Sequence, residues 1–118
     1  VKLSVKVGTA GVATTCVYLV DALGKKQKIA ESSYDNGHIS EIEIGKAPEL
    51  QNKNLQINTL VDFSNCPPEI EKAQKNKISI TYSIQGGISG NKIFKNAPND
   101  IVYNENHSIK IIKLIALK

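Results

Sequence analysis

The chain has 118 residues, a length that predicts a single domain around one hydrophobic core. All 15 basic side chains are lysines, and against 11 acidic residues they give a formal net charge of +4. Because arginine and tryptophan are absent and Tyr and Phe number only four and two, the composition disfavours sequence-specific nucleic-acid recognition and base-stacking surfaces.

The first half of the chain predicts four β-strands. Apolar and polar residues alternate over residues 1–7, the pattern of a strand with one face in the core. Residues 13–21 are apolar on both faces for part of their length, which is typical of a central strand or of a strand whose outer face meets another surface. Two further strands are predicted over 26–31 and 38–44, and the Asp-Asn-Gly turn at 35–37 predicts that they form a hairpin.

The second half predicts five more strands. Alternation is clearest over 54–63 and 77–84, whereas 108–117 is again apolar on both faces. Shorter strands are predicted around 93–94 and at 100–103.

Two irregular segments separate these strands. Residues 67–76, PPEIEKAQKN, predict a short helical connector, because proline is tolerated in the first turn and acidic side chains favour its N-terminal end. Residues 83–94, SIQGGISGNKIF, lack the glycine-to-lysine spacing and the following helix of a phosphate-binding loop. They predict a bend or bulge between two strands, with Ile88 as a candidate partner contact.

Together these elements predict an all-β fold. We expect a two-layer antiparallel β-sandwich of about 7–9 strands that spans residues 1–118 as one domain, immunoglobulin-like or transthyretin-like in general shape. The tryptophan and the paired strand cysteines of immunoglobulin domains are missing. No stretch reaches the length of a transmembrane segment and no targeting signal is visible, which slightly favours the cytoplasm over export.

The two cysteines allow at most one intramolecular disulfide. In a cytosolic protein, Cys16 would be a small core residue and Cys66 an ordinary thiol in a loop, whereas in an exported protein the two would form a bridge. A catalytic cysteine would need a histidine within hydrogen-bond reach, and neither His38 nor His107 has a recognisable signature around it. The spacing of cysteines and histidines predicts no zinc site.

Acidic and amide side chains gather in three predicted loops. Because calcium binds through oxygen ligands, the candidate ligands are Asp35, Asn99, Asp100, Asn104 and Glu105. Their spacing does not match an EF-hand, and turns use Asn and Asp to bond their own backbone. We therefore predict turn structure at these residues, and no metal or other cofactor.

The absence of any catalytic pattern and the two strands that are apolar on both faces predict a non-catalytic binding or assembly module, for instance a subunit of a larger bacterial structure. A protein partner or a second copy of the chain is favoured over a small molecule. One alternative is an exported surface domain that binds carbohydrate or calcium through its Asn/Asp loops. The other is a small Cys/His enzyme.

Overall fold

The computed structural model describes residues 1–9, 11–32, 36–64, 66–70, 78–87, 90–96, 100–103 and 108–117. In chain order, its named elements are β1 (Lys2–Gly8), β2 (Val12–Val20), β3 (Lys26–Glu31), β4 (Ile39–Glu43), α1 (Ala47–Leu50), β5 (Lys53–Asp62), β6 (Ser79–Gly87), β7 (Gly90–Lys95), β8 (Ile101–Tyr103) and β9 (Ser108–Leu117). Strands dominate this part of the chain, as the period-two alternation predicts.

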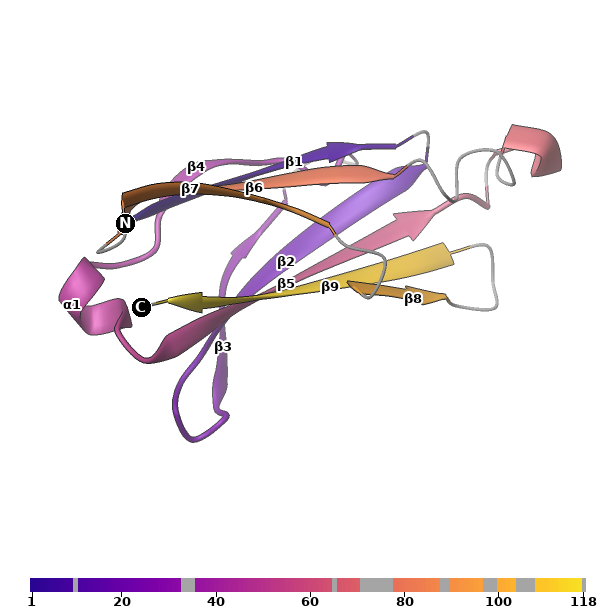
Figure 1. The fold of residues 1–118 in the computed structure, drawn as a ribbon. Helices are drawn as coiled ribbons and strands as arrows, with labels where there is room; N and C mark the ends of the chain where they lie inside the picture. The colour runs from indigo at the N-terminus through magenta and orange to yellow at the C-terminus, as the bar shows by residue number, and fades with distance from the viewer. Residues whose placement is uncertain are drawn as a thin grey trace.

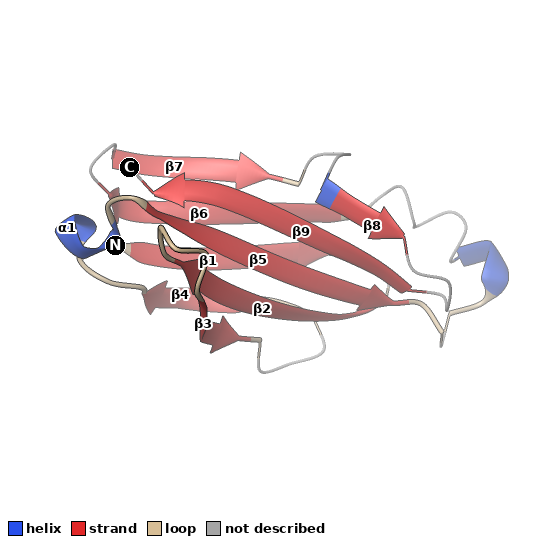
Figure 2. Ribbon diagram, turned by 90° about the horizontal axis from the view of Figure 1, so that it is seen from below, coloured by secondary structure: helices blue, strands red, loops and turns tan. Residues whose placement is uncertain are grey.

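The strands form two antiparallel sheets that lie one over the other (Figure 1). The four-stranded sheet has the order β4-β1-β6-β7, and the five-stranded sheet has the order β3-β2-β5-β9-β8. In Figure 2 the five-stranded sheet lies in front of the four-stranded one, and the long strands of both layers run roughly alongside each other, the aligned type of sheet packing. The predicted all-β two-layer sandwich is confirmed.

The hydrophobic core lies between the two sheets. The side chains predicted to face inward in 54–63 and 77–84 are all buried: Leu55, Ile57, Thr59, Val61, Phe63, Ile78, Ile80, Tyr82 and Ile84. The residues of β1 and β9 that share this interior include Leu3, Val5, Ile109 and Ile111. Burial of each such apolar side chain contributes about 1.5–3 kcal/mol relative to leaving it exposed, so this core is the main source of stability.

One polar pair lies inside the core. Thr15 on β2 and Thr59 on β5 are directly paired in the sheet, both are fully buried, and their Oγ1 atoms are 3.1 Å apart. Each hydroxyl therefore has a hydrogen-bond partner in the other, which offsets the cost of removing both from water.

We expect Thr15→Val alone to lower the free energy of unfolding by about 1–2 kcal/mol, because it leaves the buried Thr59 hydroxyl without its partner. Adding Thr59→Val should recover most of this loss, since no hydroxyl then remains to be satisfied. Urea denaturation of the two single variants and the double variant measures the coupling. Strictly additive losses would show that the two hydroxyls do not depend on each other.

The predicted hairpin between 26–31 and 38–44 is wrong. β3 pairs with β2 in one sheet and β4 pairs with β1 in the other, so the chain between them crosses from layer to layer. Gly37 has a positive φ of 72°, as the predicted turn requires of a glycine, but it is buried. Asn36 and Gly37, which favour a turn, therefore lie in a connection between the two sheets. Contacts between residues far apart in the chain decide which strands β3 and β4 pair with.

The glycine-rich segment behaves as predicted. β6 and β7 pair as an antiparallel hairpin with a register shift between Ile84 and Gly87, and Gly86 and Gly90 have φ values of 77° and 82°. These left-handed conformations favour glycine, because glycine has no Cβ and avoids the steric cost that other residues incur there. Ile88 lies outside the described residues.

The helical segments are short. Residues 68–70 are helical, at the start of the predicted connector, and 71–76 lie outside the described residues. The sequence does not predict α1, since four residues are too few for the helical period to show. In Figure 1, α1 lies at the end of the sandwich that also holds the N-terminus, on the link from β4 to β5.

Candidate functional site

The outer surface of the five-stranded sheet, which we call the open face, carries exposed apolar side chains. Its apolar members are Val12, Tyr18, Val20, Leu60, Ile112, Leu114 and Ala116, of which Tyr18, Val20 and Ile112 are half-buried. Leu114 is 65% exposed and Leu60 is 44% exposed, because the alternation that buries one side of each strand turns the other side outward. In this sheet, β2 and β9 lie on either side of β5, and these are the two strands predicted to be apolar on both faces.

The strand register arranges these side chains in rows across the open face. The two central rows are Tyr18–Gln56–Leu114 and Cys16–Asn58–Ile112. On β5 the Gln56 Nε2 donates a hydrogen bond to Asn58 Oδ1 at 3.2 Å, so the amides form an ordered polar strip between two apolar ones. Such a mixture of apolar and amide groups is typical of non-obligate protein interfaces, which are no more apolar overall than ordinary surface.

The outer surface of the four-stranded sheet has a different character. Its outward side chains on β1 and β6 are charged, hydroxylic or amide groups: Lys2, Ser4, Lys6, Ser79, Thr81, Ser83 and Gln85. On the edge strand β7, Ile93 is an apolar side chain that is 70% exposed, opposite Ser83. An isolated exposed apolar residue is ordinary, whereas apolar side chains gathered on the same side of neighbouring strands are a candidate binding surface.

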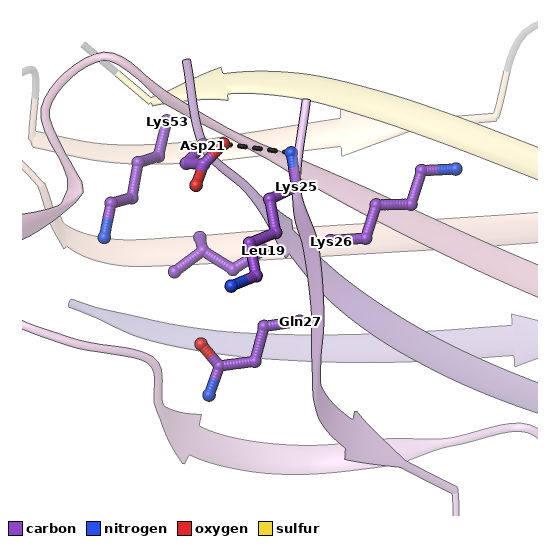
Figure 3. A pocket seen from close by; sticks show the side chains of 6 residues that line it. All are labelled: Leu19, Asp21, Lys25, Lys26, Gln27 and Lys53. Carbon is purple, nitrogen blue, oxygen red and sulfur yellow. Dashed lines mark hydrogen bonds between the residues drawn. The ribbon is translucent and has the colours of Figure 1, made fainter. Parts of the chain in front are cut away.

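The β2–β3 hairpin borders the open face at the end near α1, and it bends away from the four-stranded sheet (Figures 1 and 2). A hollow of about 380 Å³, which we call the lysine hollow, lies at this hairpin. Its lining residues are Leu19, Asp21, Lys25, Lys26, Gln27 and Lys53. Figure 3 shows Lys25, Gln27 and Lys53 on the side where Leu19 lies, whereas Lys26 extends in another direction.

Positive charge dominates the lysine hollow. Asp21 is its carboxylate, and Asp21 Oδ1 accepts hydrogen bonds from the backbone N–H groups of Leu23 and Lys25, each at 2.9 Å. This carboxylate thus closes the hairpin turn in the way that Asp commonly does. Among the residues that the structure describes, no ion pair engages Lys25, Lys26 or Lys53.

A second charged group lies on β3 beside the open face. The Lys28 ammonium is 2.8 Å from a Glu31 carboxylate oxygen, and this hydrogen bond raises the pKa of Lys28 and lowers the pKa of Glu31. Both side chains are exposed to solvent, so the pair positions charge and contributes little to stability.

Neither cysteine is in a disulfide. The prediction that Cys16 is a core residue is wrong, because Ala13, Thr15 and Val17 take the inward positions of β2 and Cys16 is turned toward the open face. Its Sγ lies 3.7 Å from Glu31 Oε1. Cys66 follows β5 and packs against the edge of the hydrophobic core.

The histidine and calcium candidates are placed only in part. His38 Nε2 lies 2.9 Å from the Val7 carbonyl oxygen, so its ring is bonded to the backbone of β1. Of the predicted calcium ligands the structure describes Asp100, whose Oδ2 accepts a hydrogen bond from Lys113 Nζ at 3.3 Å. The other histidine, His107, lies outside the described residues. So do the remaining predicted calcium ligands: Asp35, Asn99, Asn104 and Glu105.

No group of three or more His, Cys, Asp or Glu side chains suited to a metal ion occurs within the described ranges. In the same ranges, no helix has the length and hydropathy needed to cross a membrane.

Comparison of the chain with profiles of known protein families, with curated proteins and with solved structures finds no significant match. Function is therefore inferred from the chemistry of the two surfaces.

Sequence reasoning anticipated the open face in part and missed the lysine hollow. The apolar runs of β2 and β9 were the signal for the open face, whereas the alternation over 54–63 predicts only that Gln56 and Asn58 face outward. No local pattern marks the lysine hollow, because Lys53 joins Lys25 only when β5 pairs beside β2.

Proposed function

We propose that the protein is a non-catalytic binding module whose open face docks a second protein. The observation that carries the proposal is the set of apolar side chains, including the exposed Leu60 and Leu114, that β2, β5 and β9 turn to one surface, whereas the outer surface of the other sheet is polar apart from Ile93. Leu60 and Leu114 gain most from being covered, because they are the most exposed large apolar side chains of the set.

The size of the open face fits a protein partner. The described part of the chain has principal extents of 47, 25 and 24 Å. A standard protein interface covers about 800 Å² on each partner, an area of the same order as one broad side of such a molecule. A small ligand would leave most of these apolar side chains in water.

Charge favours a different protein over a second copy. The chain carries a net charge of +4, and Lys26 and Lys110 border the open face beside Val20 and Leu60. Two copies would bring like net charges together, whereas a partner with acidic groups around an apolar centre would be attracted and oriented. We therefore infer a partner of that chemistry.

We expect a photo-crosslinking residue at position 114, introduced into the protein in its source cells, to give an adduct with one other protein, because Leu114 is the most exposed large apolar side chain of the open face. The same residue at position 93, where Ile93 is equally exposed on the other sheet, is the matched control and should give no such adduct. Mass spectrometry should place the crosslink beside Asp or Glu residues of the partner.

The binding strength is tested with the purified partner. Leu114→Asp should weaken its binding at least about tenfold, and Ile93→Asp should leave it unchanged, because only the first places a carboxylate among the apolar side chains of the open face. Both variants should unfold within about 0.5 kcal/mol of the parent, since both positions are exposed. An adduct with a second copy would overturn the inferred partner, and the absence of any adduct at positions 60 and 114 would overturn the docking face.

A further inference from the structure

The lysine hollow concentrates positive charge around an apolar floor. Lys25 is exposed and Lys53 half-buried, and neither is engaged in an ion pair among the described residues. In Figure 3 their ammonium groups lie on the same side as the Gln27 amide and the half-buried Leu19 side chain. Two cations, one amide donor and one aliphatic surface thus line a single hollow of about 380 Å³.

We propose that the lysine hollow binds a carboxylate side chain from an acidic peptide segment. In the bound state, Lys25 and Lys53 hold the carboxylate between their ammonium groups and Gln27 donates a further hydrogen bond. Leu19 covers the methylene groups that join a Glu carboxylate to the peptide backbone.

Three features favour a carboxylate over a phosphate group. The lining contains no arginine, the residue whose planar guanidinium matches a phosphate with paired hydrogen bonds. Asp21 adds a negative charge to the lining, which opposes a doubly charged phosphate more than a singly charged carboxylate. A free inorganic anion would gain nothing from the aliphatic side chain of Leu19, whereas the methylene groups of a peptide side chain would pack against it.

The lining also disfavours a nucleic acid. None of its residues is aromatic, so bases would find no stacking surface there. An acidic peptide needs only charge complementarity and a small apolar contact, and the lysine hollow supplies both.

This inference rests on the proposed docking function only in assigning the acidic segment to the partner protein. The lysine hollow lies on the core side of this end of the sheet, because Leu19, which packs against the core, lines it together with its register partner Gln27, whereas Lys26 pairs with Val20 on the open face. A partner seated on the open face would reach the lysine hollow with an acidic segment that passes around the edge strand β3.

The test uses the whole chain and a short fluorescein-labelled peptide of alternating glutamate and leucine, followed by fluorescence anisotropy. We expect saturable binding that weakens as salt is raised, because exposed charge contacts are screened. The same peptide with glutamine in place of glutamate should bind at least about fivefold more weakly, since it cannot pair with Lys25 and Lys53.

Matched variants separate the hollow from general charge. Lys25→Gln with Lys53→Gln should weaken binding of the glutamate peptide about tenfold, whereas Lys6→Gln with Lys95→Gln, which removes the same charge from exposed positions on the other sheet, should change it less than about twofold. Equal effects of the two double variants would overturn the proposal. So would equal binding of the two peptides.

Competition identifies the ligand chemistry. Inorganic phosphate and a single-stranded oligonucleotide should displace the glutamate peptide only at concentrations that also act through ionic strength. Displacement by either at concentrations matched to the peptide would overturn the choice of a carboxylate. Leu114→Asp should bind the peptide unchanged, so a failure at the lysine hollow can be told apart from a failure of the open face.

Discussion

Replacing Gly37 with Ala is expected to lower the free energy of unfolding by about 2–4 kcal/mol, although it adds a single methyl group. A Cβ at this position would lie 2.8 Å from Ala13 Cβ and 3.1 Å from Val7 Cγ2. Those two atoms belong to strands of opposite sheets, so neither can yield without disturbing its own layer. The positive φ of 72° adds a backbone cost for any residue with a Cβ.

Gly24 provides the matched control. It has a similar φ of 82°, in the β2–β3 turn, but a Cβ there would meet nothing within 4 Å. Gly24→Ala should therefore lose only the backbone part, about 1 kcal/mol. Chemical denaturation of both variants separates the conformational cost from the packing cost. Equal losses would show that Gly37 sits in an open turn, as a hairpin would place it, rather than between the two sheets.

The second large effect is expected at alkaline pH. Tyr82 is fully buried between the sheets, and burial raises the pKa of its hydroxyl well above the ordinary tyrosine value, with a further contribution from the charge of the Asp100 carboxylate. In the unfolded chain the same hydroxyl ionises near pH 10. Above that pH the unfolded state releases the proton while the folded state keeps it.

The sign of the pH dependence follows from this difference. The contribution of Tyr82 to stability is fully present below about pH 10 and is lost as the pH rises from there toward the raised pKa of the folded state. The loss approaches about 1.4 kcal/mol per pH unit, or about 2–3 kcal/mol at pH 12. We expect Tyr82→Phe to remove this part of the alkaline loss, because phenylalanine has no proton to release.

Denaturant unfolding of the parent and of Tyr82→Phe between pH 8 and about pH 12 measures the effect. At pH 8 the two should differ by no more than about 1 kcal/mol, because the Tyr82 hydroxyl has no hydrogen-bond partner among the described residues. Tyr18→Phe, at a half-buried position on the open face, should keep the alkaline loss of the parent. Parallel curves for the parent and Tyr82→Phe would contradict the role given to burial.

Much of the strand content could be predicted from the sequence because period-two alternation is a local property. A strand that buries one side must place apolar residues at every second position, as in 54–63, and this holds whatever the strand pairs with. The bend at Gly86 to Gly90 is likewise local, because left-handed backbone conformations select glycine. The side of β2 that carries Cys16 could not be assigned from the sequence, because β2 is apolar on both sides for part of its length. The packing of the whole sheet places Cys16 on the outer side.

The open face shows how far pattern alone reaches. The apolar residues on both sides of β2 and β9 predict that the outer side of each strand carries apolar side chains, because alternation along a strand is a local property. That the two strands flank β5 in one sheet, and so join their outward residues into one surface, was decided by cross-strand pairing between residues far apart in the chain.

Pairing also decided the features that local chemistry misassigned. The residues at 35–37 favour a turn, but β3 and β4 pair with strands of different sheets, and Gly37 is buried. The lysine hollow exists only because β5 brings Lys53 beside the β2–β3 hairpin. Local alternation of apolar and polar residues identifies the strands and their apolar sides. Cross-strand pairing fixes which surfaces those sides form, because register and sheet order depend on contacts between residues far apart in the chain.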